Sequence, residues 1–332
     1  MRIITDKAGW REELSTVPFH DFYHTFEYHI LDYSGEPFLF VFECENEKLL
    51  LPLLLRAIDG TPYSDFTSVY GYVGCLYNTL NPGKKLLDLF RVEFSAYLLE
   101  NNIISLFNRS HPLIPHSLLL PESMGDVVCL NKTIGVNTRR PEKEQVADYA
   151  STLRRQLSRI RLRGVSCRVG QEVDDWSLFA RLYNQTMERK NASAGYFFDS
   201  SYFMAFRQAR EFESVLLLAE FGGKCIGGIL CVITDSIMQY HLGAIDWAYV
   251  SLSPLKLLID EARHLATERD IACFHLGGGI GCQKDGLYQF KSRFSHNTTN
   301  FYTWKWVVSP EIYQHLSQGI TGERFPLYRN LR

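Results

Sequence analysis

The alternation of apolar and polar residues predicts two strand hairpins of the same shape. Phe38–Cys44 and Leu49–Arg56 are apolar strand-like runs joined by a short polar turn. Val215–Phe221 and Cys225–Thr234 are joined in the same way by a glycine-containing turn. The chain therefore contains two β-hairpins, one in each half.

Between the hairpins, the apolar positions follow the helical repeat. A helix is predicted from about Lys143 to Arg163, where Gly164 ends it, and a second from about Asp174 to Lys190. The packed side of the first helix carries Val146, Ala150, Leu153, Leu157 and Ile160. Its other side carries five arginines, Arg154, Arg155, Arg159, Arg161 and Arg163.

The same unit of structure occurs twice along the chain. The segment 81–88, Asn-Pro-Gly-Lys-Lys-Leu-Leu-Asp, aligns without gaps with the segment 253–260, Ser-Pro-Leu-Lys-Leu-Leu-Ile-Asp. Each copy places a capping residue and then proline at the predicted start of a helix, and an apolar strand follows at Ile103–Phe107 or Ile271–Leu276. We therefore expect two related α/β domains, at 1–145 and 146–300, and a terminal segment at 301–332 that returns to the first domain. A ligand site is expected in a cleft between the domains.

Composition is that of a globular chain with full cores. Of the 332 residues, 46% are hydrophobic and 22% are charged, and the net charge of -2 argues against a wholly basic nucleic-acid-binding surface. The eight cysteines form no CxxC pair, and neither they nor the ten histidines show metal-ligand spacing. We expect no metal site and no tightly bound cofactor. The sequence shows no signal peptide and no apolar run long enough for a membrane helix, so a cytoplasmic protein is expected.

Several motifs carry a resemblance to a known family. They are Ser-Val-Tyr-Gly-Tyr-Val-Gly at 68–74, Phe-Asn-Arg-Ser-His-Pro-Leu at 107–113, and Thr-Met-Glu-Arg at 186–189. The most specific is Leu-Gly-Gly-Gly-Ile-Gly at 276–281, followed by the segment 285–294 with its Phe-Lys pair. Hairpin, strand, helix and strand in this order resemble the GNAT acetyltransferase core. Two such units in tandem resemble the Fem family of peptidyltransferases over nearly the whole chain.

The resemblance implies a fold and an activity. The fold would be α/β (α+β), with two tandem GNAT-like domains, each a mixed twisted sheet flanked by helices. The activity would be aminoacyl or acyl transfer to an amine on a cell-envelope precursor, such as a nucleotide- or lipid-linked aminosugar or peptide, and a lipid-linked substrate would allow peripheral membrane association. One alternative is an acyl-coenzyme A N-acetyltransferase acting on a sugar amine or small metabolite. Another is a non-catalytic binding protein with a duplicated domain.

The resemblance assigns catalytic positions in the second half. Lys291 would hold an anionic group and stabilise developing negative charge, and Phe290 would shape the pocket floor. Tyr240 could donate a proton to the leaving group or a hydrogen bond to a carbonyl. Against this, Lys291 could be a solvated strand residue and Tyr240 a wall residue with a satisfied hydroxyl.

Other residues are candidates for substrate binding: Tyr70, Arg109, Arg189, Tyr196 and Asp285. Arg109 stands where a strand ends, which suits capture of a phosphate or carboxylate, or equally a salt bridge. Tyr70 is the repeat counterpart of Tyr240. Asp285 could orient Lys291, but capping a turn is the simpler function.

The donor is the open question in the sequence. Coenzyme A-dependent relatives bind pyrophosphate with a glycine pair before the central helix, and neither corresponding loop, at 77–83 or 248–254, has that pair. This favours the aminoacyl-tRNA donor of the resembled family, with acyl-coenzyme A as the alternative. Arg154, Arg155 and Arg159 would form a contact for the polyanion, unless they are an ordinary solvated helix face. The coiled-coil arm of some Fem members has no room in this chain.

Overall fold

The computed structural model describes residues 1–121, 123–279, 283–322 and 324–330. The chain divides into two compact units, Met1–Asn131 with Asn300–Arg332, and Lys132–Thr299. The boundary expected at residue 145 is wrong. It falls after Asn131 because the second half of strand β7 (Asp126–Asn137) pairs with β12 (Cys273–Gly277) and so belongs to the second unit.

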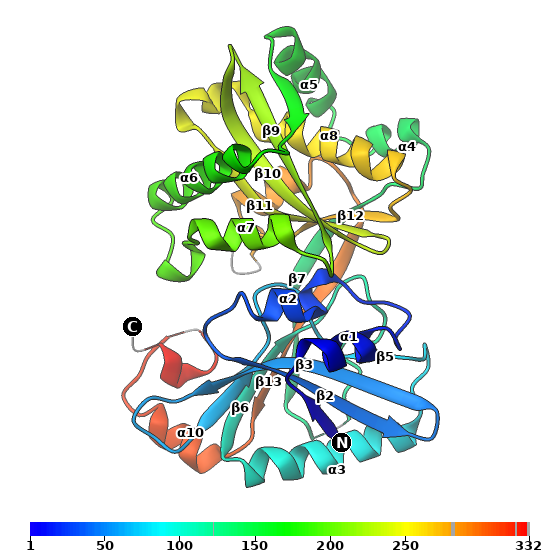
Figure 1. Cartoon of the computed structure of the whole chain (residues 1–332), viewed down its shortest axis with the longest axis vertical. Helices are drawn as coiled ribbons and strands as arrows, with labels where there is room; N and C mark the ends of the chain where they lie inside the picture. Colours follow the sequence, from blue (N-terminus) through cyan, green and yellow to red (C-terminus); the bar gives the residue numbers. More distant parts are fainter. Residues whose placement is uncertain (122, 280–282, 323, 331–332) are drawn as a thin grey trace. The chain divides into compact units, whose positions relative to one another are not determined.

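The first unit is a mixed sheet with the strand order β1-β2-β3-β4-β6-β13 (Figure 1). Its strands are β1 (Arg2–Ile4), β2 (Glu36–Cys44), β3 (Glu47–Ala57), β4 (Ser64–Thr67), β6 (Ile103–Arg109) and β13 (Thr298–Val307), with the short β5 (Leu76–Tyr77) beside β3. Strands β4 and β6 are parallel, and the other pairs named in this order are antiparallel.

Residues of β2 alternate between two faces of this sheet. Phe40 and Phe42 pack with helix α3 (Lys84–Glu100), whereas Leu39 and Val41 pack in a separate cluster with Trp10 of α1 (Lys7–Leu14). The remaining helices of this unit are α2 (Phe26–His29), α10 (Pro310–Leu316) and the 3₁₀ turns η1 (Phe22–His24) and η5 (Leu327–Arg329). The two-sided apolar pattern of the strand thus accounts for helices on both faces.

The end of the described chain is held by a buried carboxylate. Asp65 accepts hydrogen bonds from the Tyr328 hydroxyl at 3.0 Å and from Arg329 Nε at 2.8 Å. Arg56 Nε donates to the other oxygen of Asp65 at 2.7 Å. A buried carboxylate with several donors is satisfied, so these contacts tie η5 to β3 and β4 of the first unit.

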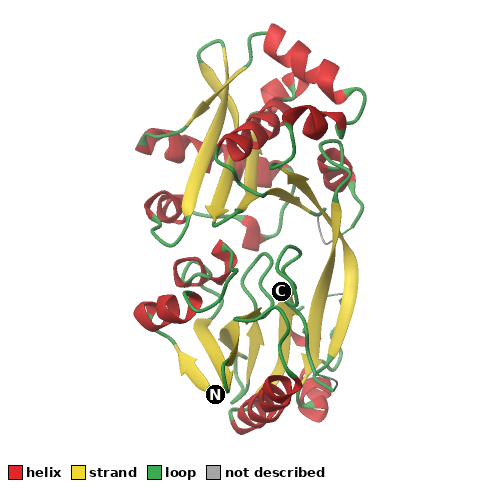
Figure 2. Cartoon of the chain, turned by 90° about the vertical axis from the view of Figure 1, so that its right-hand side faces the viewer, coloured by secondary structure: helices red, strands yellow, loops and turns green. Residues whose placement is uncertain are grey.

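The second unit is a twisted mixed sheet with helices on both sides (Figure 2). Its strand order is β7-β12-β11-β10-β9-β8, in which only β11 and β12 are parallel among the described pairs. The strands besides β7 and β12 are β8 (Ser166–Val169), β9 (Glu213–Phe221), β10 (Lys224–Thr234) and β11 (Ile237–Ile245). The helices are α4 (Glu142–Ala147), α5 (Leu153–Leu162), α6 (Val173–Arg189), α7 (Ser200–Gln208), α8 (Pro254–Glu268) and α9 (Gly286–Lys291), with 3₁₀ turns η2 (Ala194–Tyr196) and η3 (Trp247–Leu252).

The alternation of β9 again decides which helix lies on which face. Leu217 and Ala219 belong to the core cluster that includes α5 and α8. On the opposite face, Leu218 and Phe179 of α6 lie so close to Gly228 that a Cβ there would clash with both. The sheet is therefore the central layer of the unit, and the expected fold of two mixed twisted sheets flanked by helices is confirmed.

Two predicted helix boundaries are wrong, each for a physical reason. The helix expected over 143–163 is broken between α4 and α5, because the amide of Ala150 donates to the carbonyl of Arg293 at 2.9 Å instead of to its own helix. The first repeat helix, α3, begins at Lys84 and not at Pro82, since the amide of Gly83 donates to the Glu47 carboxylate at 2.9 Å.

Candidate active site

The site begins where the pairing of two parallel strands ends. The described pairs between β11 and β12 end at Gln239 and His275. A β-bulge at His241 follows, where the register between β10 and β11 shifts by one residue. Bulges bend a strand and increase its local twist. Tyr240 therefore stands on β11 directly beyond the paired stretch, level with the end of β12.

Lys291 reaches this place from the short helix α9. The Asp285 carboxylate caps α9 and accepts the amide of Tyr288 at 2.8 Å. Lys291, the last residue of α9, is only 6% exposed. Its Nζ donates to the carbonyl of Gly278 at 2.8 Å and lies 5.4 Å from the centre of the Tyr240 ring. The lysine amine thus joins the end of β12 to the face of an aromatic side chain on β11.

Burial changes the acid–base chemistry of this lysine. It lowers the pKa of Lys291 to about 7, against the attraction of Asp285 and with the added repulsion of Lys190. At neutral pH the amine therefore exists in both protonation states. A group of this kind can donate a charged hydrogen bond or accept a proton without a large energetic penalty.

Tyr240 is suited to donate a hydrogen bond and not to lose its proton. Burial raises the pKa of Tyr240, with a smaller contribution from Cys231. Its hydroxyl occupies the space next to Gly243, where an added Cβ would collide with it. Because a phenol of raised pKa stays protonated, Tyr240 can orient or stabilise an acceptor oxygen but is a weak acid.

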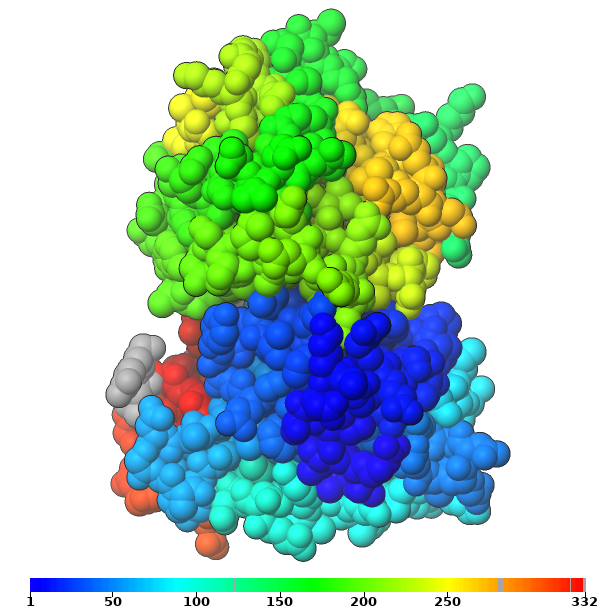
Figure 3. Space-filling model, in the orientation of Figure 1, coloured from blue at the N-terminus to red at the C-terminus, as the bar shows by residue number. Residues whose placement is uncertain are grey.

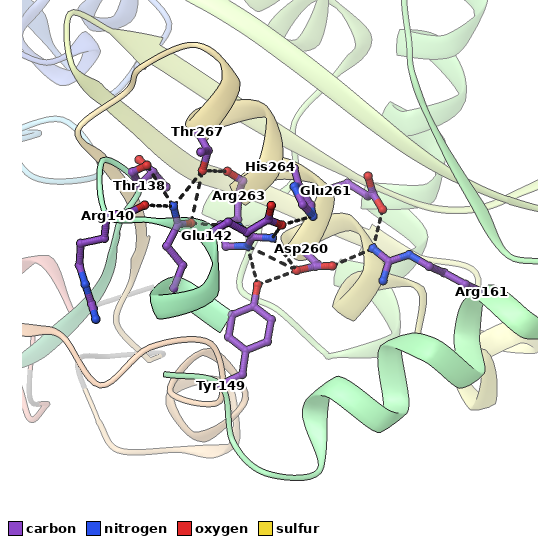
Figure 4. Close-up of polar contacts among 11 residues, drawn as sticks. Thr138, Arg140, Glu142, Tyr149, Arg161, Asp260, Glu261, Arg263, His264 and Thr267 are labelled. Atoms are coloured by element: carbon purple, nitrogen blue, oxygen red, sulfur yellow. Dashed lines mark hydrogen bonds and ion pairs between the residues drawn. The ribbon is translucent and has the colours of Figure 1, made fainter. Parts of the chain in front are cut away.

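Aromatic packing connects α9 with a buried ion network. Phe290 packs edge-to-face on Phe294 with 5.7 Å between ring centres, and Phe294 packs in the same way on Tyr149. The Tyr149 hydroxyl donates to Asp260 at 2.6 Å and accepts from Arg263 Nε at 2.8 Å (Figure 4). The segment between α4 and α5 therefore lies between the lysine helix and α8.

The centre of this ion network, at Arg263, is almost closed to water. Arg263 is 1% exposed, and its guanidinium also donates to Gln145 at 3.0 Å and pairs with Glu142 at 3.2 Å (Figure 4). Asp260 also accepts from Arg161 at 2.7 Å. Burial alone would raise the pKa of Asp260, but the hydrogen bonds from Tyr149 and Arg161 outweigh it and lower that pKa. The buried members Tyr149, Asp260 and Arg263 satisfy one another's hydrogen bonds, so this part of the network is structural.

The end of α6 supplies further groups in the second unit. The guanidinium of Arg189 lies 4.2 Å from the centre of the Trp247 ring, which is half exposed. Tyr196 is half buried at the end of η2. Lys190, exposed at the C-terminus of α6, acts on the pKa of Lys291. The sequence motif pointed to Arg189 but not to its neighbour Lys190.

The remaining predicted residues lie in the first unit. Tyr70 follows β4 in a loop and is 49% exposed, so it does not share the strand position of its expected counterpart Tyr240. Arg109 ends β6, with its guanidinium 4.7 Å from the centre of the Phe107 ring. A hollow of about 630 Å³ beside α10 includes none of the predicted site residues among its lining.

The start of α8 differs from a glycine-rich phosphate loop. Strand β11 is followed by η3, then by Ser253 in the left-handed conformation and Pro254 at the first helical position. Lys256 lies in the first turn, and burial together with the charge of Arg293 lowers its pKa. This loop is built from a 3₁₀ turn and a proline, as the absence of the glycine pair predicted.

Some residues of the site could not be identified from the sequence. Tyr149 and Arg263 belong to no motif, and only their contacts reveal them; Gly278 and Asp260 stand in the quoted motifs, but their partners could not be read from the sequence. Within the described residues, no group of three or more His, Cys, Asp and Glu side chains could hold a metal ion. No helix in the described part of the chain is both long and apolar enough to cross a membrane. Ile280 and Gly281 of the predicted motif lie outside the described residues.

Comparison with protein families identifies the second unit. Residues 147–292 match the family model described as an acetyltransferase (GNAT) domain. No curated protein matches the sequence. The match lies within the second unit, which therefore has the fold of a GNAT-type domain.

Solved structures with the same fold extend over nearly the whole chain. The crystal structure of FemX is 12% identical, covers 95% of this chain and 99% of its own, and has a TM-score of 0.71. The structure of L-PGS from Bacillus licheniformis is 11% identical, with coverage of 96% and 98% and a TM-score of 0.59. The C-terminal domain (DUF2156) of a protein assigned as a lysylphosphatidylglycerol synthetase, from Agrobacterium fabrum, is 14% identical, with coverage of 90% and 92% and a TM-score of 0.57. The resemblance to the Fem family is thus confirmed at the level of the fold.

Proposed function

We propose that this chain is an N-acyltransferase that moves an aminoacyl group from an aminoacyl-tRNA to an amine of a cell-envelope precursor. The observation that carries the proposal is the buried Lys291, held between the Gly278 carbonyl and the Tyr240 ring in a GNAT-type domain. The name of one structure with this fold, a lysylphosphatidylglycerol synthetase, refers to a lipid product and favours an envelope acceptor.

The reaction needs one bond made and one broken. The acceptor amine attacks the acyl carbon, a C–N bond forms, the carbonyl oxygen becomes an oxyanion, and the C–O bond to the tRNA ribose then breaks. The amine loses one proton and the leaving ribose oxygen gains one. Protonated Lys291 would donate to the developing negative charge, and a preorganised donor of this kind is worth about 10²–10³ in rate.

Tyr240 and Phe290 would act beside the lysine. The Tyr240 hydroxyl would donate a second hydrogen bond to an oxygen of the substrate while keeping its own proton. Phe290 would exclude water, which strengthens the interaction between Lys291 and the oxyanion. Arg189 and Tyr196 of the second unit would contact the acceptor, and Asp285 would hold α9 in position.

Two other functions remain as defined alternatives. An acyl-coenzyme A donor keeps the same chemistry with a C–S bond broken, and the match to an acetyltransferase family model favours it. The loop at the start of α8, with Ser253 and Pro254 in place of a glycine pair, favours the tRNA donor. A non-catalytic binding protein would leave Lys291 without a function.

The deciding experiment is a competition for the purified protein. Labelled aminoacyl-tRNA is titrated at low and physiological salt, with and without acetyl-coenzyme A. Salt-sensitive tRNA binding that the coenzyme does not displace supports the proposal. Coenzyme binding without tRNA affinity would replace it with the acyl-coenzyme A function, and no binding of either would favour the non-catalytic alternative.

A further inference from the structure

Helix α5 carries arginines that the protein does not neutralise. Arg154, Arg155 and Arg159 are exposed, and none of them pairs with a carboxylate among the described residues. Their neighbour Arg161, on the same helix, pairs with Asp260 at 2.7 Å and with Glu261 at 2.8 Å. The helix thus has a neutralised end and a stretch with unbalanced positive charge.

A polar hollow lies along the unbalanced stretch. Its volume is about 200 Å³, and it is lined by Thr152, Arg155, Gln156 and Arg159. This is smaller than the pockets of roughly 300–1,000 Å³ that enclose whole small-molecule ligands. The buried Oε1 of Gln156 has no hydrogen-bond partner among the described residues, so the hollow also offers an unused polar group. It fits a phosphate or a sugar hydroxyl better than an entire cofactor.

More positive charge continues from this hollow toward the lysine helix. Arg293 donates to the Thr152 hydroxyl at 2.7 Å, and Thr152 lines the hollow. Lys256, in the first turn of α8, is near enough to Arg293 that the charge of Arg293 adds to burial in lowering the pKa of Lys256. Arg293 stands two residues after Lys291 in the chain. A row of cations therefore leads from the hollow to the end of α9.

We propose that this α5 groove, formed by Thr152, Arg155, Gln156, Arg159 and Arg293, binds consecutive phosphates of an RNA backbone. Arg155 and Arg159 are one helical turn apart, so they contact separate groups along a chain of phosphates, not a single ion. Thr152 and Gln156 supply hydrogen-bond partners for a ribose hydroxyl between them. Arg155 and Arg159 are exposed, so a macromolecule has access to them, and Figure 3 shows part of α5 at the surface of the second unit.

This inference rests on the proposed function in one respect: the RNA in the groove is taken to be the aminoacyl-tRNA donor. If the acyl donor is aminoacyl-tRNA, the groove holds its backbone while the acylated end extends toward Lys291. The phosphate contacts would add affinity without taking part in the bond changes. Loss of the groove should therefore raise the KM for the donor and leave kcat unchanged.

The test is tRNA binding measured as a function of salt. Fluorescently labelled deacylated tRNA is titrated with the wild type and with the Arg155→Gln/Arg159→Gln variant. The slope of log K against log salt should become shallower by about 1.4–1.8 when two phosphate contacts are lost. The matched control is Lys143→Gln/Arg181→Gln, which removes two exposed cations of the same unit outside the groove and should keep the wild-type slope.

The outcomes separate this inference from the proposed function. An unaltered slope in the Arg155/Arg159 variant, or an equal change in the control, would overturn the α5 groove. Displacement of tRNA from it by acetyl-coenzyme A, or binding to phosphatidylglycerol vesicles that depends on the same arginines, would overturn its assignment to RNA. Transfer from aminoacyl-tRNA with an unchanged KM in the variant would remove the groove but leave the proposed activity standing.

Discussion

Lys291 Nζ lies 2.8 Å from the carbonyl oxygen of Gly278, the residue that follows strand β12. The helix that carries the lysine and the strand that ends before the glycine are thereby joined at one polar contact in a buried place. Burial makes the amine of this contact able to exchange a proton near neutral pH, because it lowers the pKa of Lys291 to about 7. The proposed mechanism depends on that amine more than on any other group.

Replacements of Lys291 should show how much of the transfer rate depends on its charge and how much on the packing of its side chain. Lys291→Met keeps an unbranched apolar side chain but no donor, and we expect about 10²–10³-fold slower acyl transfer, measured by single-turnover kinetics. Lys291→Arg keeps a cation and should retain part of the rate. Equal turnover in the wild type and the Met variant, with normal melting curves, would exclude Lys291 from the chemistry.

The pH dependence of the rate should follow this lysine. If protonated Lys291 is the donor, kcat falls as the pH rises through about 7, whereas Lys291→Arg shows no such limb because arginine stays charged. Lys190→Gln removes a repelling cation and should move the limb to higher pH. The control Lys224→Gln, another exposed lysine of the second unit, should leave it in place. If kcat of Lys190→Gln falls over the same pH range as in the wild type, the coupling between the two lysines is contradicted.

The free energy of unfolding should rise with pH because of the lowered pKa of Lys291. The folded pKa of Lys291, about 7, lies below its ordinary value of 10.5, so between these values the unfolded chain binds more protons. The free energy of unfolding of the wild type should therefore rise relative to Lys291→Met by about 1.4 kcal/mol per pH unit from pH 7 to 9. Urea unfolding at several pH values measures this difference. A constant difference would mean that Lys291 is not desolvated.

Gly243 should be required because of Tyr240. A Cβ at position 243 would meet the Tyr240 hydroxyl, so Gly243→Ala should displace that ring and slow transfer to a similar extent as Tyr240→Phe. The two effects should not add in the double variant, because both remove the same hydroxyl from its place. Gly195→Ala, where a Cβ meets nothing within 4 Å, is the control. Additive losses would show that the two residues act separately.

Two carboxylates of the ion network, Asp260 and Glu261, should contribute very different amounts to the free energy of unfolding. Asp260→Ala leaves the Arg263 charge, 1% exposed, without its buried carboxylate partner and with only the half-exposed Glu142, and we expect a loss of about 3–5 kcal/mol in the free energy of unfolding. Glu261→Ala removes only the more exposed partner of Arg161 and should cost less than about 1 kcal/mol. Chemical denaturation measures both. Similar losses in the two variants would mean that the network is not buried in solution.

Much of the fold could be predicted because its signals are local. The hairpins of β2–β3 and β9–β10 were visible in runs of apolar residues, and the cap and proline at 253–254 marked the start of α8. The break between α4 and α5 could not be predicted. The apolar stripe continues through it, and the competing partner of the Ala150 amide, the carbonyl of Arg293, is more than a hundred residues away.

For the candidate site, the motif around Lys291 was informative and its surroundings were not. The Phe-Lys pair pointed to the residue, and the alternative of a solvated strand residue is wrong, because Lys291 is buried at the end of a short helix capped by Asp285. Tyr70 matched Tyr240 in the repeat, yet it stands in an exposed loop. Repeats preserve the order of elements more faithfully than the position of a single side chain, because one residue of displacement at a strand end changes where that side chain points.

Residue order alone was enough for the two hairpins and the two-unit plan, since periodicity and capping residues are properties of neighbours in the chain, and the family motif named Lys291 as a candidate. The reactivity of Lys291 arose only on folding. It depends on Tyr240 from β11, Gly278 after β12 and Lys190 after α6, which come together through sheet pairing and helix packing. Desolvation of a charge is set by everything that surrounds it, and no stretch of sequence contains that information by itself.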